Sequence, residues 1–470
     1  MSEPPHPLDL IDRERVLQLL TEHLSSAWTS FDSARPKEPQ LDQALFVRLS
    51  EGLPAAPGDP EASLEDIVSV LDASVSPSRP LYSAYIGSTG LEAGVLAGAL
   101  GNAYDVNLAA AAGAAEMLEN QTIRWVAEFV GYPVGDGAFT SGGMTSNLTA
   151  LTAAREQALP GSRYDGLSGR PAAVYCSEES HHSVARAVEV IGLGSQALRR
   201  IPIDAERRMR VDALADALAA DRAAGVVPVA VVATSGTTLT GAIDPLAEVA
   251  DVCAEYDVWM HVDGAYGGPA AGVPSLAPRF RGIERAQSLT IDAHKWLGVQ
   301  KSCSLVMLAN SGPLESAFAH DERYMLHAGV AANGVDRTLE YSRPVRSLKL
   351  WLAFRIYGAD MLRRWIEMTA EHARTLADAL RANPRFELLN EPSLSVVCFR
   401  DRAGGDMSVA ELDEHNLQLA RAITDDGRVY LAPAQVDGMT CLRVCFMNFR
   451  TTAEQVSELL HVIEELAGAG

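Results

Sequence analysis

One lysine is a candidate nucleophile because of its neighbours and its rarity. Lys295 lies in the run DAHKW, directly after the apolar segment Ser288–Asp292. Only four of the 39 basic residues are lysines, so the chain uses arginine wherever any positive charge suffices, which favours a role as an amine for the lysines that are present. Because desolvation lowers the pKa of a lysine, we expect a nucleophilic amine that can form a Schiff base. The alternative is an ordinary lysine in a solvated loop.

A pair of glycines marks a candidate anion site. Gly142 and Gly143 follow the apolar segment Gly137–Thr140 and precede a helix predicted at Ser146–Gln157. Glycines let a ligand approach the backbone closely, and the first N–H groups of a helix have no partner within it. This combination suits a phosphate group. The segment can equally be a plain connection between a strand and a helix, and it matches neither the Walker nor the dinucleotide-binding glycine pattern.

A carboxylate, a histidine pair and a run of hydroxyls follow three further apolar segments. Asp263 can pair with a cationic ring nitrogen, and a flat imidazole such as that of His181 can stack on a ring. The hydroxyls of Thr234–Thr238 can contact a ligand. Each feature can instead cap a turn or a helix. We expect no metal site, because adjacent histidines point in different directions and no carboxylate or third histidine recurs near His182 at helical spacing.

These features share one predicted location. Strands that alternate with helices form a mostly parallel sheet, and ligands bind at the carboxyl ends of its strands. An anion site, a flat ring, a carboxylate and an amine together meet the needs of pyridoxal 5'-phosphate, which has a phosphate, a ring face, a pyridine nitrogen and an aldehyde. The sequence therefore predicts a site for this cofactor.

The elements that must position these residues divide the chain into three predicted units. Residues 1–90 are helical segments interrupted by proline-rich joints, residues 91–365 alternate short strands with helices, and residues 366–470 combine helices with further strands. We expect an α/β fold with a mostly parallel sheet in the large domain, a small α+β C-terminal domain and an N-terminal helical arm. The strands of the small domain are predicted at Phe386–Leu389, Ser395–Arg400, Val429–Ala432 and Cys441–Phe446.

Composition argues against several classes of protein. The 470 residues are 47% hydrophobic and 21% charged, which is typical of a globular chain. The formal net charge of -22 disfavours binding to nucleic acid or to anionic membranes. No apolar run approaches the ~18 residues that a membrane span needs, and no signal peptide is visible. The six cysteines form no CxxC pair, which indicates reduced, buried thiols in a cytoplasmic protein.

From about Pro80 to the C-terminus, the order and spacing of these motifs resemble the group II pyridoxal-phosphate decarboxylases. The most specific parts are HVDGAYGG and DAHKW, preceded by TSGG and SHHS. The resemblance implies the type I aminotransferase-like fold and a homodimer with shared active sites, in which the N-terminal helices wrap the partner. It also implies pyridoxal phosphate as the cofactor and an amino acid as the substrate.

The resemblance implies a role for each matching residue. Lys295 is the implied Schiff-base lysine, Asp263 the partner of the pyridinium nitrogen and His181 the catalytic residue that stacks on the ring. The other implied cofactor contacts are Gly143, Met144, Thr145, Thr238, Ala265 and His294. The implied substrate contacts are Tyr85, Ser88, Asn107 and Arg443. Asn107 matches the place where aromatic amino acid decarboxylases contribute an aromatic side chain from the neighbouring subunit, which weighs against a catechol or indole substrate.

A second departure concerns the reaction. In this family a mobile loop carries a tyrosine that protonates the substrate after CO2 leaves. The matching loop, Asp321–Tyr341, has Gly334 or Val335 near that place, with Tyr324 and Tyr341 offset. Members without this tyrosine often let O2 react, giving an aldehyde, ammonia and peroxide.

Three hypotheses about the reaction stay open at this point. We expect α-decarboxylation of an L-amino acid through Lys295. The alternative is decarboxylation-coupled oxidative deamination, or another reaction such as β-elimination or transamination, in specialised metabolism. The third is a catalytically silent binding or structural protein of this fold.

Overall fold

The larger sheet carries the strands whose ends form the predicted site. The structure is a computed structural model that describes residues 11–32, 42–109, 112–320, 334–403 and 407–468. Within these residues, seven strands form this sheet: β1 (Asp136–Thr140), β2 (Ala172–Ser177), β3 (Leu198–Ile201), β4 (Val227–Thr234), β5 (Trp259–Asp263), β6 (Ser288–Ile291) and β7 (Ser304–Leu308). Their order is β1-β7-β6-β5-β4-β2-β3. β7 pairs antiparallel with both neighbours, whereas β6, β5, β4, β2 and β3 run parallel, so the carboxyl ends of these five lie at one edge.

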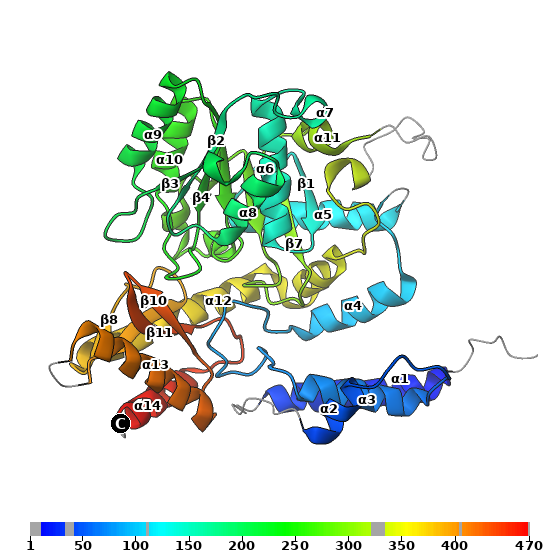
Figure 1. Ribbon diagram of the computed structural model, residues 1–470. Helices are drawn as coiled ribbons and strands as arrows, with labels where there is room; N and C mark the ends of the chain where they lie inside the picture. Colours follow the sequence, from blue (N-terminus) through cyan, green and yellow to red (C-terminus); the bar gives the residue numbers. More distant parts are fainter. Residues whose placement is uncertain (1–10, 33–41, 110–111, 321–333, 404–406, 469–470) are drawn as a thin grey trace, which may run out of the picture.

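Helices cover both faces of this sheet (Figure 1). One face packs against α6 (Gly143–Ala158), α8 (His182–Val190) and α11 (Pro313–Phe318). The other packs against α5 (Ala114–Val130), α9 (Val211–Ala223), α10 (Leu246–Glu255) and α12 (Ser347–Ala382). Strands covered on both faces have nearly continuous apolar sequences, and the last six residues of β4, VPVAVVAT, are all buried. Short helices in the connections are α7 (Ser162–Asp165), η1 (Ser195–Ala197), η2 (Gly268–Gly272), η3 (Ala277–Phe280), η4 (Ile283–Arg285) and η5 (Gly334–Arg337).

The smaller sheet is antiparallel. β8 (Phe386–Leu388), β9 (Val396–Asp401), β10 (Ala432–Val436) and β11 (Met439–Cys445) lie in the order β10-β11-β9-β8. α13 (Val409–Asp426), α14 (Ala453–Gly468) and the end of α12 bury its apolar face. α12 connects the two sheets and departs from helical geometry at Gly358, with φ 71° and ψ 162°, a conformation that glycine adopts without a Cβ clash.

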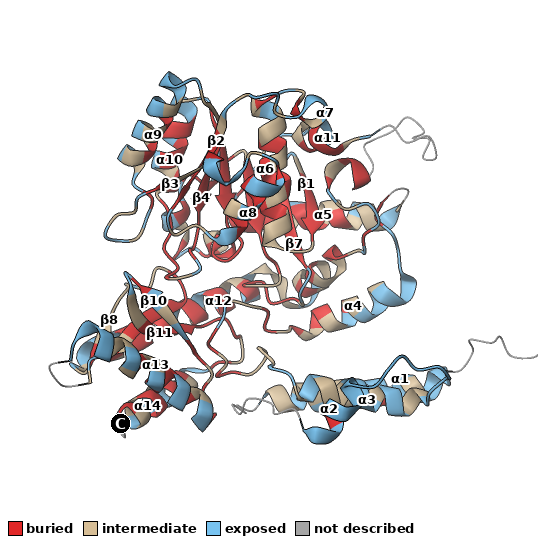
Figure 2. Ribbon diagram, viewed as in Figure 1, coloured by how far each residue is buried: buried red, intermediate tan, exposed pale blue. Residues whose placement is uncertain are grey.

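The N-terminal helices lie apart from both sheets (Figure 1). α1 (Arg13–Phe31), α2 (Gln43–Leu49) and α3 (Pro60–Asp72) each begin after an aspartate whose side chain accepts a hydrogen bond from a first-turn N–H group. Most of their residues are exposed (Figure 2). α4 (Glu92–Tyr104) follows them and packs against α12.

One predicted strand is wrong in position. The prediction at Val429–Ala432 ends where β10 begins. Tyr430 instead pairs with the segment before α4: its N–H donates to the carbonyl of Leu81 (3.1 Å), and its carbonyl accepts from the N–H of Ser83 (2.8 Å). The rings of Tyr82 and Tyr430 stack with centroids 5.2 Å apart. The apolar run is thus used by an N-terminal segment that is remote in sequence.

The predicted fold class is confirmed, with a mostly parallel sheet and a smaller second sheet. The predicted boundaries at residues 90 and 365 stay a prediction, and α12 crosses the second of them. All six cysteines are free and buried. In the part of the chain that the structure describes, no helix combines the length and apolar character of a membrane span, and no group of three or more His, Cys, Asp or Glu side chains could hold a metal ion.

Candidate active site

Lys295 lies in a tight turn after β6, where it pairs with a buried carboxylate. Its Nζ is 3.0 Å from Oδ2 of Asp292, and its backbone N–H donates to the Asp292 carbonyl at 3.0 Å. Asp292 is 2% exposed, and its Oδ1 has no hydrogen-bond partner among the described residues. Burial lowers the pKa of Lys295, but the carboxylates of Asp292 and Asp263 raise it more, so the net pKa lies above its usual value. The expectation of a lowered pKa is therefore wrong here, because two acidic side chains face the ammonium group.

The start of α6 lies against the same turn. The N–H groups at the start of α6, those of Gly143, Met144 and Thr145, have no acceptor within the helix. No side chain caps this helix start either. A Cβ atom on Gly143 would lie 2.9 Å from Oδ2 of Asp292 and 3.1 Å from Cβ of Ala265. Only glycine therefore lets this helix start approach the end of β5 and the lysine turn so closely.

His294 directly precedes Lys295 in the lysine turn. Its Nδ1 is 2.9 Å from the carbonyl oxygen of Cys303, and its Nε2 is 3.6 Å from Oδ2 of Asp292. Burial lowers its pKa. A Cβ atom on Gly142 would lie 3.9 Å from Cε1 of this ring, so the imidazole borders the predicted anion site.

Asp263 ends β5 and is hydrogen-bonded to an asparagine on α6. Nδ2 of Asn147 donates to Oδ2 of Asp263 at 2.9 Å and to Oγ of Ser183 at 3.0 Å. The N–H of Ala265 donates to Oδ1 of Asp263 at 3.1 Å. Oγ of Ser183 is in turn 2.9 Å from Nδ1 of His181, the N-cap of α8. The His181 ring is exposed, and partial desolvation by its surroundings lowers its pKa. One amide group thus links the predicted pyridinium partner to the predicted stacking histidine.

A second histidine lies behind Asn147. His261 on β5 places its Nε2 3.0 Å from Oδ1 of Asn147 and its Nδ1 2.8 Å from Oγ of Ser288 on β6. The indole N–H of Trp259 donates to the same Oγ at 2.8 Å. Burial lowers the pKa of His261 to about 4, so its ring is neutral at pH 7.

Arg443 donates to backbone carbonyls from three nitrogens. Nε donates to Leu239 and Nη1 to Ala84, each at 3.0 Å, and Nη2 donates to Thr238. The residue is 6% exposed. It therefore ties β11 to the loop after β4 and to the segment that carries Tyr85, which is itself 57% exposed. Its binding of substrate stays a prediction.

Two further predicted substrate residues are held within their own chain. The hydroxyl of Ser88 is buried and donates to the carbonyl of Val299 at 2.9 Å. Oδ1 of Asn107 accepts from the N–H groups of Ala109 (3.0 Å) and Arg343 (3.1 Å). A contribution of Asn107 to a neighbouring subunit stays a prediction.

The predicted acid loop is described only from residue 334 onward, and Tyr324 lies outside the described residues. Gly334 and Val335 are buried in η5. A Cβ atom on Gly334 would clash with the carbonyl oxygen of Leu108. Tyr341 is 40% exposed. Of the two residues predicted near the place of the family's tyrosine, Gly334 therefore has no room for a side chain in this arrangement, and Val335 is apolar and buried.

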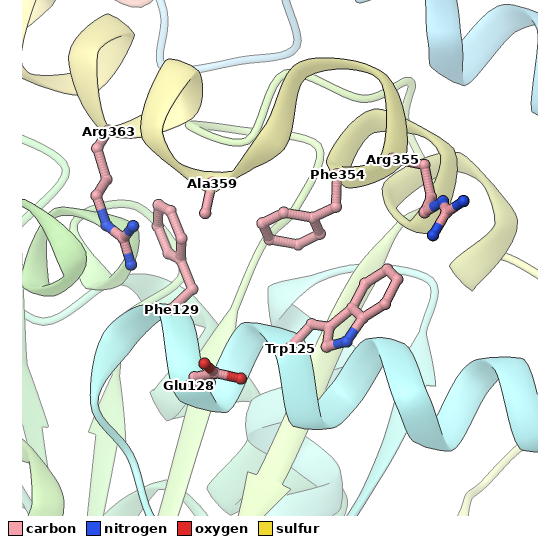
Figure 3. Close-up of a pocket in the computed structure, with 7 residues that line it drawn as sticks. All are labelled: Trp125, Glu128, Phe129, Phe354, Arg355, Ala359 and Arg363. Carbon is pink, nitrogen blue, oxygen red and sulfur yellow. The ribbon is translucent and has the colours of Figure 1, made fainter.

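A cavity of about 410 Å³ lies elsewhere, between α5 and α12 (Figure 3). Phe129 and Phe354 line it with ring centroids 5.8 Å apart, and the guanidinium of Arg363 lies 4.8 Å from the Phe129 centroid. None of the predicted site residues lines this cavity. It is therefore separate from the predicted cofactor site.

Sequence reasoning assigned no role to Asp292, Asn147 or His261, although their spacing carried a signal. Asp292 lies three residues before Lys295, within one turn. Asn147 lies about one helical turn after Gly143, and His261 shares a strand face with Asp263. Residue type alone did not reveal them, because an amide and a buried histidine are common in protein cores.

The arrangement fits the predicted cofactor. A glycine at a helix start offers free N–H groups to a phosphate, and the lysine turn lies against it. A buried carboxylate ends β5, and an exposed imidazole follows β2. These are the groups that hold a phosphate, a pyridine nitrogen and a ring face, with an amine for the aldehyde.

Comparisons with known proteins identify one family. The family model described as pyridoxal-dependent decarboxylase conserved domain matches residues 46–402. The chain is 31% identical over 462 residues to an aromatic-L-amino-acid decarboxylase of Bacillus atrophaeus, covering 96% of this chain and 94% of that protein. It is 30% identical to a phenylacetaldehyde synthase of a Rosa hybrid cultivar, covering 92% and 90%. The crystal structure of Oryza sativa TDC with PLP and tryptamine matches with a TM-score of 0.92 and 27% identity over 99% of both chains. The chain therefore belongs to the group II pyridoxal-phosphate-dependent decarboxylase family, and its cofactor is pyridoxal 5'-phosphate.

Proposed function

We propose that the chain removes the α-carboxyl group of an L-amino acid, with Lys295 as the residue that carries the cofactor. The observation that carries this proposal is the convergence of Lys295, Asp263 and His181 at the carboxyl ends of parallel strands. Asn147 and Ser183 connect Asp263 to His181, and the carboxylate of Asp263 acts electrostatically on Lys295. The similarity to an aromatic-L-amino-acid decarboxylase over nearly the whole chain supports the same reaction class.

The residues of the chain bind and orient the cofactor, which supplies an electron sink for the bond that breaks at the substrate α-carbon. The N–H groups at the start of α6 and the helix dipole favour a phosphate group there. Asp263 is 5% exposed and accepts two hydrogen bonds, so its carboxylate is fixed in position to hold a proton on the pyridine nitrogen. The exposed ring of His181 offers a flat face for stacking.

Asp292 controls the charge of Lys295. Its carboxylate holds a proton on Nζ at 3.0 Å, so the lysine must lose that proton before its amine can attack an aldehyde. The unpaired Oδ1 of Asp292 lies against the helix start that we propose binds the phosphate.

The test of the site is the removal of the Asp263 carboxylate. Asp263→Ala should lower the rate of the chemical step about a hundredfold or more while the melting temperature of the protein changes little, because electrostatic stabilisation of this kind is a large catalytic contribution. Activity close to that of the wild type would contradict the assignment. Lys295→Ala serves as the inactive reference.

One observation favours a second outcome, an aldehyde product. Gly334 and Val335 lie near the predicted place of the family's proton-donating tyrosine; Gly334 has no room for a side chain, and Val335 carries no acidic proton. Without an acid that protonates the α-carbon after CO2 leaves, O2 can react there: one amino acid, one O2 and one water give aldehyde, CO2, ammonia and hydrogen peroxide. The similarity to a phenylacetaldehyde synthase supports this alternative.

Simultaneous records of released CO2 and dissolved O2 distinguish the two outcomes. The purified protein, loaded with pyridoxal phosphate, is supplied with pooled amino acids that include S-substituted cysteines. CO2 without O2 uptake supports a plain decarboxylase, and Tyr341→Phe then tests whether the offset tyrosine is the acid. CO2 matched by equal O2 uptake supports the aldehyde-forming reaction. If there is no CO2 release and no O2 uptake, both the decarboxylase and the aldehyde-forming outcome are contradicted, and β-elimination or transamination is favoured.

We also propose a homodimer in which the N-terminal helices pack on the partner. Leu17, Leu49 and Leu71 on α1, α2 and α3 are 59–64% exposed in the single chain, whereas a stable helical unit would bury such residues. We expect Leu71→Glu to shift the protein toward monomers in light scattering. Val409→Glu, at an equally exposed apolar position on α13, is the matched control and should leave the dimer unchanged.

A further inference from the structure

Trp259, Ser288, His261 and Asn147 form one hydrogen-bond chain that ends on Asp263. We propose that Asn147 is a positioning residue that aligns Asp263 and His181 together, and that His261 fixes the orientation of its amide. This inference rests on the proposed role of Asp263 as partner of the pyridine nitrogen. None of the four side chains belongs to the predicted cofactor or substrate contacts.

The two ends of this hydrogen-bond chain fix the direction in which hydrogens are donated along it. The indole N–H of Trp259 can only donate, and it donates to Oγ of Ser288. An ionised carboxylate can only accept, so the amide group of Asn147 that faces Asp263 must be its NH2. Oδ1 of Asn147 therefore faces Nε2 of His261, which must carry a hydrogen to donate at 3.0 Å.

Because His261 is neutral, the direction of hydrogen donation is also fixed at its other ring nitrogen. A neutral imidazole with a hydrogen on Nε2 has a bare Nδ1 that accepts. The hydroxyl of Ser288 is 2.8 Å from this Nδ1 and is free to donate to it, because its oxygen accepts from Trp259. Every donor in the chain thus meets an acceptor, and reversing the Asn147 amide would place two oxygens against each other at Asp263.

A branch of the chain extends to His181. The second amide hydrogen of Asn147 goes to Oγ of Ser183, which leaves the hydroxyl hydrogen of Ser183 for Nδ1 of His181 at 2.9 Å. The backbone N–H of Ser183 donates to the same Nδ1 at 3.1 Å. Nδ1 is therefore an acceptor, and a neutral His181 carries its hydrogen on Nε2. The amide of Asn147 thereby makes the carboxylate contact and supports the same His181 tautomer that the Ser183 backbone N–H requires.

Burial makes the arrangement sensitive to the loss of one partner. Asn147 is 1% exposed, His261 and Ser288 are 0% exposed and Trp259 is 7% exposed. Water cannot readily replace a lost donor at such depth, so without His261 the Oδ1 of Asn147 is left buried without a hydrogen bond and the amide is held only from its NH2 side.

Two substitutions of His261 separate its hydrogen bond from its volume. His261→Phe keeps a ring of similar size and removes the N–H, whereas His261→Gln keeps an N–H for Oδ1 of Asn147. The matched control is Thr149→Val. Thr149 lies on α6, as Asn147 does, and is 0% exposed. Among the described residues, its hydroxyl contacts only the carbonyl of Thr145. Asp263→Asn is the reference for a weakened pyridine-nitrogen contact.

The readouts are the dissociation constant of pyridoxal phosphate, the visible absorption spectrum of the bound cofactor and the melting temperature of the cofactor-free protein. We expect His261→Phe to weaken cofactor binding by up to about tenfold, the usual scale for a hydrogen bond between neutral groups, and to change the spectrum in the direction of Asp263→Asn. His261→Gln should restore both, and Thr149→Val should alter neither.

The outcomes distinguish this inference from the proposed function. These outcomes apply when Asp263→Asn does change the spectrum. The inference is then overturned if folded His261→Phe has the spectrum and cofactor affinity of the wild type. It is also overturned if His261→Gln loses as much cofactor affinity as His261→Phe. No effect of Asp263→Asn would overturn the proposed role of Asp263 itself. If His261→Phe does not fold, Ser288→Ala removes the donor to Nδ1 with a smaller change in volume. Ring nitrogen NMR of the wild-type protein then decides independently, because a hydrogen on Nδ1 of His261 would contradict the direction of the chain.

Discussion

Replacing Asp292 by asparagine should speed up the reaction of Lys295 with pyridoxal phosphate. The carboxylate lies 3.0 Å from Nζ and favours the charged amine, which cannot attack an aldehyde. At this distance, with an effective dielectric constant of about 20, Coulomb's law gives about 5.5 kcal/mol. This value is an upper limit, because the Lys295 side chain is 24% exposed and solvent screens the pair. A quarter of it, about 1.4 kcal/mol, already raises the ratio of neutral to charged amine about tenfold.

The assay mixes cofactor-free protein with pyridoxal phosphate and follows the rise of visible absorption over a range of pH. Asp292→Asn should react about tenfold faster than the wild type near neutral pH, and the two rates should converge at high pH, where both amines are neutral. Asp251→Asn is the matched control, because it removes a surface carboxylate that pairs with Arg285 at 2.7 Å. An unchanged or slower reaction of folded Asp292→Asn would refute the reasoning that this carboxylate holds the proton on Lys295.

Two further predictions concern buried acids outside the site. Glu119→Gln should lower the free energy of unfolding by about 3–5 kcal/mol in urea titrations. Glu119 and Arg343 form a buried bidentate pair at 2.7 and 2.8 Å, and the substitution leaves the guanidinium charge without a counter-ion. A loss below about 1 kcal/mol would contradict this. Asp244 is buried and accepts N–H groups of Thr234 and Met209, and its burial raises its pKa from 3.8 to about 6. The unfolded chain therefore releases this proton first as the pH rises, so Asp244 should lower wild-type stability by about 3 kcal/mol between pH 3.8 and about 6, and this fall should be absent from Asp244→Asn. Parallel pH profiles of the two proteins would count against the assignment.

The pattern of apolar residues was sufficient to locate most of the large sheet. The predictions for Val227–Thr234, Trp259–Asp263 and Ser304–Leu308 match β4, β5 and β7 residue for residue. These strands are covered on both faces, so burial demands a continuous apolar run that has clear ends in the sequence. The strand predicted at Val429–Ala432 was misplaced because an apolar run does not indicate its partner, which in this case is the segment around Leu81.

By itself, the sequence determined the fold class, the family and the cofactor, because these follow from residue types in a fixed order along the chain: the glycine pair, Asp263 and Lys295. Only the tertiary structure decided how these groups are charged and oriented. Lys295 has a raised rather than a lowered pKa because two carboxylates face it, and Arg443 donates to carbonyls from three different segments. Asn147 and Asp263 are 116 residues apart in the chain and 2.9 Å apart in space. A pKa and a hydrogen bond depend on such distances, which no local spacing in the sequence contains.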